Sequence, residues 1–104
     1  MPEVWTVGPM NLEQLRARRE EILATARRHG VRTLRVFGSV ARGDADAESD
    51  IDFLVELEPG RSLLDQGALL MELREQLGCQ VDVMTEAGLR PSVRARVLQE
   101  ALTL

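Results

Sequence analysis

The sequence of 104 residues contains no tyrosine, no lysine, one cysteine and only three aromatic side chains. With so few aromatic rings, we do not expect stacking platforms for nucleic-acid bases. The net charge of -4 at pH 7 also lacks the basic footprint of a protein that binds nucleic acid directly. All thirteen basic residues are arginine, which reflects either genome composition or arginine-mediated contact with a partner.

The sequence also lacks the features that direct a chain into or across a membrane. No apolar run approaches the ~20 residues of a membrane span, and the first ten residues lack the charged and apolar segments of a signal peptide. The lone Cys79 offers no disulfide framework. Together these absences predict a cytoplasmic protein with no membrane association.

The length and the breakers near the start predict the domain organisation. Pro2, Gly8 and Pro9 interrupt regular structure, so we expect residues 1–10 to form an N-terminal arm. Residues 11–104 are enough for one hydrophobic core and too few for a second, which predicts a single domain.

Hydrophobic periodicity and capping residues predict an α/β (α+β) fold, with a small three-stranded mixed sheet flanked by helices. In the helix after Ser62, leucines are expected to form the core stripe, namely Leu63, Leu69, Leu70, Leu73 and Leu77. The expected elements in chain order are a helix over 12–29, a strand over 31–37, a helical turn within 39–49, a strand over 51–57, a helix over 63–77, a strand over 80–84 and a helix over 91–102.

The connections between strands predict where the polar residues meet. A helical crossover joins the second and third strands, so these should be parallel. About twelve residues without a full crossover helix join the first two strands, which favours antiparallel pairing. The end of the first strand and the starts of the other two then share one edge of the sheet. The residues expected there are Gly38, Ser39, Asp50, Asp52 and Asp82.

Three carboxylates at this edge indicate a cation site. Asp50 and Asp52 project from one face of a strand because its side chains alternate. Asp82 lies between two valines, where a charge is costly unless it is paired or bound to metal. Carboxylate oxygens are the ligands that Mg²⁺ prefers. The sequence therefore predicts a magnesium site formed by Asp50, Asp52 and Asp82.

The Gly38-Ser39 pair adds a candidate phosphate site, because glycine lets the backbone approach a phosphate closely. A phosphate-binding backbone beside a Mg²⁺ ion held by carboxylates is typical of sites for phosphoryl or nucleotidyl transfer. In a purely structural interpretation, Gly38 is a strand-end turn and residues 44–50 form a solvated acidic loop. That interpretation leaves Asp52 and Asp82 unexplained within apolar runs.

Gly38-Ser39, followed after ten residues by Asp50-x-Asp52, resembles the signature of the DNA polymerase β-like nucleotidyltransferase superfamily. The segment GSVARGDADAESDIDFLV and the ending VDVMTEAGLRPSVRARVLQEALTL resemble its minimal nucleotidyltransferase branch. The resemblance implies the polymerase β-like fold and two Mg²⁺ ions bound by Asp50 and Asp52. It also implies that Asp82 acts as metal ligand or base.

The same resemblance implies that Gly38 and Ser39 hold the triphosphate of ATP. Arg42 fits the ARG segment of the branch, where it either contacts the phosphates of the nucleotide or pairs with the acidic loop.

The minimal branch resembles the antitoxin half of toxin–antitoxin modules whose partner is a HEPN-domain ribonuclease. This implies AMP transfer from ATP to a tyrosine of the toxin, within a hetero-oligomer of the two proteins. The chain is too short for its own acceptor pocket and has no tyrosine, which agrees with an acceptor on another protein. Two alternatives remain. One is an antitoxin that neutralises by binding alone; the other is a small-molecule nucleotidyltransferase, a class that generally carries an added domain.

Overall fold

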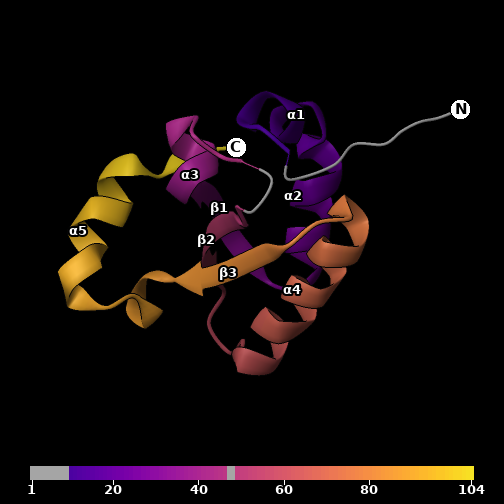
Figure 1. Cartoon of the computed structure of the whole chain (residues 1–104). Coiled ribbons are helices and arrows are strands. Elements are labelled where there is room, and N and C mark those ends of the chain that lie inside the picture. The colour runs from indigo at the N-terminus through magenta and orange to yellow at the C-terminus, as the bar shows by residue number, and fades with distance from the viewer. Residues whose placement is uncertain (1–9, 47–48) are drawn as a thin grey trace, which may run out of the picture.

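The structure, a computed structural model, describes residues 10–46 and 49–104 (Figure 1). The predicted arm over residues 1–10 lies outside the described residues except for Met10. The elements in chain order are α1 (Leu12–Ala17), α2 (Arg19–Arg28), β1 (Val31–Phe37), α3 (Gly38–Arg42), β2 (Ile51–Leu57), α4 (Leu63–Leu77), β3 (Val81–Thr85), the 3-10 helix η1 (Glu86–Gly88), α5 (Pro91–Glu100) and β4 (Leu102–Thr103).

The strands form a mixed sheet in the order β3-β2-β1-β4. β1 runs antiparallel to β2, and β2 runs parallel to β3, so both predicted pairings are confirmed. The prediction of three strands is wrong, because β4 adds to the free edge of β1 through the pairs Arg35–Thr103 and Val36–Leu102. The last helix was expected to reach Leu102, but it ends at Glu100 and the extended backbone of Ala101 turns the chain into β4.

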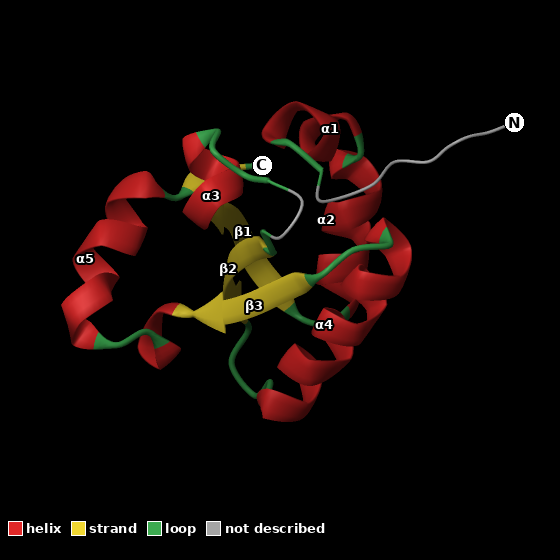
Figure 2. Cartoon of the chain, in the orientation of Figure 1, coloured by secondary structure: helices red, strands yellow, loops and turns green. Residues whose placement is uncertain are grey.

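Helices cover the two faces of the sheet unequally (Figure 2). α2 and α4 lie on one side and α5 lies on the other. Strand side chains alternate between faces, so Ile51, Phe53 and Val55 join the main core with the leucines of α4. Leu54 belongs to a smaller cluster with Leu89 and Val97 of α5. By the same alternation, Asp52 lies on the α5 face.

The predicted helix over residues 12–29 is broken at Arg18 into α1 and α2. The Arg18 guanidinium donates to the backbone carbonyl of Gln76 at 2.9 Å and also pairs with Glu21. Leu15 and Ile22, on either side of the break, are both fully buried in the same core. The uninterrupted helical pattern of the sequence is thus broken at a residue whose side chain contacts the end of α4.

α4 begins at the predicted cap, because the Ser62 hydroxyl accepts from the Leu64 N–H and Asp65 closes the capping box. Leu69, Leu73 and Leu77 are buried as expected, but Leu63 is 80% exposed. Six residues at 100° each place Leu63 about 120° away from Leu69 around the helix. The prediction of Leu63 in the core stripe is therefore wrong. No helix among the described residues is long and apolar enough to cross a membrane.

Candidate active site

The sheet register brings the predicted residues of three strands to one edge. Phe37, the last residue of β1, is paired with Asp52 of β2, and Asp52 is paired with Asp82 of β3. Neighbouring strands are about 4.8 Å apart, so the two aspartates are direct cross-strand neighbours on the α5 face. Gly38 follows Phe37 at the same edge. The predicted convergence of Gly38, Asp52 and Asp82 is confirmed.

Gly38 makes the approach to Asp52 possible. Its φ of +76° is a left-handed conformation that side chains disfavour. A Cβ atom built on Gly38 would lie 2.3 Å from Oδ2 of Asp52. Glycine is therefore required here both by the backbone conformation and by the space that the Asp52 carboxylate occupies.

The electrostatic setting of Asp52 disfavours its charged form. Burial, and after it the charges of Asp82, Asp50 and Glu100, raise the pKa of this carboxyl to about 6, although the charge of Arg42 lowers it. Asp50, which precedes β2, is exposed, as is Asp82. A partly buried carboxylate among three others is the arrangement that a bound cation stabilises.

The three aspartates do not form a ready-made ligand set. In the part of the chain that the structure describes, no group of three or more His, Cys, Asp and Glu side chains is placed to hold a metal ion. The donor chemistry nevertheless fits Mg²⁺, since all three side chains offer carboxylate oxygens. Burial and the neighbouring carboxylates together raise the pKa of Asp52, and a cation at this edge would offset both effects.

The residues of α3 lie at the same edge. Within the described ranges, the Ser39 hydroxyl makes no hydrogen bond, although the Ser39 carbonyl accepts from Asp44 N at 3.0 Å. The Arg42 Nε donates to Asp44 Oδ2 at 3.3 Å, so the predicted pairing with the acidic loop is present. Among the described residues, Ser39 therefore has a free hydroxyl, one residue after Gly38.

Glu100 is the residue at this edge that sequence reasoning missed. Its carboxylate accepts from Gly38 N at 2.7 Å and from Arg42 Nη1 at 3.1 Å. The hydrogen bond from Arg42 to Glu100 is the main reason why the pKa of Arg42 is raised, and the bond to Asp44 adds to it. The only signal in the sequence is that Glu100 lies in the ending that resembles the minimal branch, where nothing distinguishes it from a surface glutamate.

Comparison with known proteins identifies the family. Residues 18–104 match the family described as the nucleotidyltransferase domain. The matched region contains every residue of the edge described above. The chain belongs to the nucleotidyltransferase domain family.

Relatives of this nucleotidyltransferase domain occur in archaea. A provisionally named protein adenylyltransferase, MJ0435 of Methanocaldococcus jannaschii, is 41% identical over 93 residues, which cover 89% of this chain and 97% of that protein. Protein adenylyltransferase MntA of Thermococcus cleftensis is 40% identical over 75 residues, which cover 72% of this chain and 76% of that protein.

Solved structures share the fold. A provisionally assigned minimal nucleotidyltransferase is 53% identical, covers 91% of this chain and 97% of its own, and superposes with a TM-score of 0.80. The crystal structure of a toxin–antitoxin with AMP-PNP is 20% identical over 81% of this chain and 69% of its own, with a TM-score of 0.69, and shows the fold alone. The predicted mixed sheet flanked by helices is confirmed by these matches.

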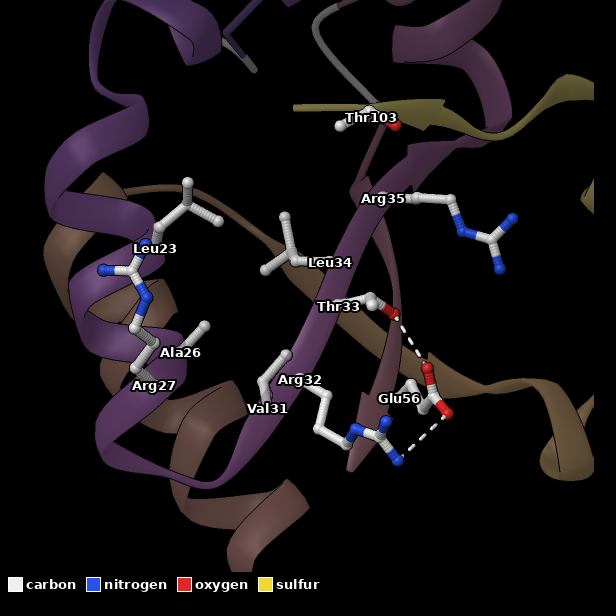
Figure 3. Close-up of a pocket in the computed structure, with 10 residues that line it drawn as sticks. All are labelled: Leu23, Ala26, Arg27, Val31, Arg32, Thr33, Leu34, Arg35, Glu56 and Thr103. Atoms are coloured by element: carbon white, nitrogen blue, oxygen red, sulfur yellow. Dashed lines mark hydrogen bonds and ion pairs between the residues drawn. The ribbon is translucent and has the colours of Figure 1, made fainter. Parts of the chain in front are cut away.

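The cavity shown in Figure 3 is separate from the carboxylate edge of the nucleotidyltransferase domain. It has a volume of about 520 Å³ and lies between α2 and β1, with three arginines among its lining residues. Glu56 at its rim is within 3.8 Å of the Arg32 guanidinium and accepts from the Thr33 hydroxyl at 3.4 Å. None of the predicted site residues lines this cavity.

The raised pKa of Asp52 predicts a pH-dependent stability. Because the folded value of about 6 exceeds the ordinary value of 3.8, the fold favours the protonated form. The resulting stability is fully present below pH 3.8 and is lost as the pH rises through about 6. In EDTA at pH 8, Asp52→Asn should therefore raise the free energy of unfolding by about 1–2 kcal/mol, after allowance for solvent at a partly exposed group.

Urea unfolding of both proteins between pH 8 and pH 4 measures this difference, which should narrow as the pH falls. Added Mg²⁺ at pH 8 should stabilise the wild type and not Asp52→Asn. If the difference in the free energy of unfolding between the two proteins is constant with pH, the pKa of Asp52 is not raised in the folded protein.

Proposed function

We propose that this chain is a Mg²⁺-dependent protein adenylyltransferase and the antitoxin of a HEPN-domain ribonuclease toxin. It transfers AMP from ATP to a tyrosine of that toxin, in the cytoplasm and within a hetero-oligomer. The observation that carries the proposal is the pairing of Asp52 with Asp82 across β2 and β3, directly beside Gly38. We assign the activity to a single nucleotidyltransferase domain over residues 11–104.

Asp50, Asp52 and Asp82 would hold Mg²⁺, with two ions expected from the family resemblance. Bound Mg²⁺ supplies the positive charge that neutralises the triphosphate and the reacting oxygens. Asp52 is partly buried and is the fixed member, while Asp50 and Asp82 are exposed and able to adjust. This division suits a site that is completed when substrate binds.

Asp82 also serves as the base. The tyrosine hydroxyl oxygen attacks the α-phosphorus of ATP, its proton passes to the Asp82 carboxylate, and the bond to the leaving pyrophosphate breaks. Gly38, the free hydroxyl of Ser39 and the Arg42 guanidinium orient the phosphates. The exposed position of Asp82 lets an acceptor from another protein reach it.

Four observations support an acceptor on a partner. The chain contains no tyrosine, and the carboxylates lie at an open sheet edge outside the cavity of Figure 3. Relatives at 40–41% identity are named protein adenylyltransferases, and a protein of the same fold was crystallised as a toxin–antitoxin with AMP-PNP.

The direct test is label transfer. The purified chain is incubated with ATP labelled at the α-phosphate, Mg²⁺ and the product of the adjacent gene, with EDTA and ATP labelled at the γ-phosphate as controls. We expect α-label on a tyrosine of the partner, no γ-label and no transfer in EDTA. Absence of α-label from the partner would overturn the proposal.

Neutralisation by binding alone is the second candidate. Its supporting observation is that the aspartates are not assembled as a ligand set within the described residues. The substitution of Asp52 argued in the Discussion separates the two candidates.

A further inference from the structure

The carboxylate of Glu100 accepts hydrogen bonds from Gly38 and Arg42, the residues that the proposed function assigns to phosphate binding. Its Oε2 accepts from Gly38 N at 2.7 Å. The Arg42 Nη1 donates to Glu100 Oε1 at 3.1 Å and to Oε2 at 3.3 Å. The Glu100 side chain is only 16% exposed, whereas Arg42 is 47% exposed. An anion from the end of α5 is thus held inside the candidate nucleotide site.

Without the Gly38 and Arg42 donors, the position of the Glu100 carboxylate would be electrostatically unfavourable. Glu100 lies close enough to Asp52 to raise the pKa of that carboxyl, together with Asp82 and Asp50. An anion among three others requires compensating donors to remain there. In the described chain, the Glu100 carboxylate accepts from two donors, the Gly38 N–H and the Arg42 guanidinium.

A carboxylate and a phosphate group use the same donors. Both accept charge-assisted hydrogen bonds from arginine and from backbone N–H groups. One N–H and one guanidinium nitrogen cannot serve both anions fully at once. Glu100 and a nucleotide phosphate are therefore competitors for Gly38 and Arg42.

We propose that Glu100 is an internal stand-in for a nucleotide phosphate, which ATP displaces when it binds. This inference rests on the proposed function, since it requires that the edge binds a nucleotide. Glu100 then sets the affinity for nucleotide, and a ligand without phosphate does not release it. Displacement also removes a side-chain contact between the end of α5 and α3, because Glu100 is the last residue of α5 and its donors belong to α3.

The competing interpretation is that Glu100 positions Arg42 for the nucleotide without leaving. The two interpretations predict opposite effects of removing its charge. A competitor weakens nucleotide binding, so its neutralisation tightens binding; a positioning residue improves binding, so its neutralisation weakens it.

The test is the affinity of Glu100→Gln for ATP in the presence of Mg²⁺, measured by calorimetry. Glutamine keeps the size of the side chain and one carbonyl acceptor, and it removes the charge. We expect a Kd about tenfold lower than that of the wild type, because a charge-assisted contact is replaced by a neutral one. Glu75→Gln removes the same charge from an exposed position on α4 and should leave Kd within twofold.

An unchanged or higher Kd for Glu100→Gln overturns the inference. If the wild type binds ATP and transfers AMP, the proposed function survives that result. If neither protein binds ATP, both the proposed function and this inference fail.

Hydrogen exchange of the wild type gives a second readout that needs no variant. ATP with Mg²⁺ should increase exchange over residues 100–103, because Glu100 leaves its donors. Adenosine, which lacks phosphate, should not do so. Greater protection of these residues with ATP would overturn the inference.

Discussion

Asp52→Asn should reduce AMP transfer to the partner by about a thousandfold or more, while the protein remains folded. Asp52 is the member of the carboxylate group that is partly buried and fixed by pairing on both sides, with Phe37 on β1 and Asp82 on β3. Asparagine has the same shape but cannot supply the charge that holds Mg²⁺, and charge stabilisation is the main contribution to catalysis at such sites. Initial rates of α-label transfer measure the loss.

Glu75→Gln is the control for the charge change, because it removes one carboxylate from the exposed face of α4 and makes none of the contacts described above. It should transfer AMP at the wild-type rate. An Asp52→Asn protein that transfers AMP normally would contradict the assignment of Asp52 as a metal ligand.

The same variant separates catalysis from occlusion in cells that express the partner. If neutralisation requires AMP transfer, cells with Asp52→Asn should not survive expression of the toxin. If the variant still protects the cells although its transfer activity in vitro is lost, neutralisation occurs by binding alone.

The carboxylate edge could be predicted from sequence because local patterns determine it. β1 and β2 begin and end at the predicted residues, 31–37 and 51–57, since each is bounded by glycine, aspartate or proline. Crossover rules then gave the strand directions. Directions and ends together are sufficient to place Gly38, Asp52 and Asp82 at one edge.

The features that could not be predicted depend on contacts between distant residues. The first helix breaks at Arg18, whose side chain contacts Gln76, 58 residues further along the chain. β4 has only two residues, and its pairing with β1 leaves no periodic pattern. In the sequence, Glu100 is typical of the exposed end of an amphipathic helix. In the fold it lies beside Gly38, 62 residues away. The geometry of a metal site depends on where the aspartate side chains lie, and the spacing of these residues in the sequence does not determine it.

Gly38→Ala should impair both stability and AMP transfer, because the new methyl group would lie 2.3 Å from Oδ2 of Asp52. The φ of +76° adds a backbone penalty of about 1 kcal/mol for any residue with a Cβ. We expect the free energy of unfolding to fall by about 2 kcal/mol or more. Transfer should fall about a hundredfold, since displacement of a reacting group by 1 Å has effects of that size.

Gly60→Ala is the matched control for the backbone penalty. Gly60 has a φ of +89° after β2, and a Cβ built there meets no atom within 4 Å. It should lose only about 1 kcal/mol of stability and none of the transfer activity. The comparison isolates the contact with Asp52, because both variants bear the same backbone strain. Equal losses of stability with full activity in both variants would show that Asp52 moves aside freely, and that the close approach of Gly38 is not part of the site.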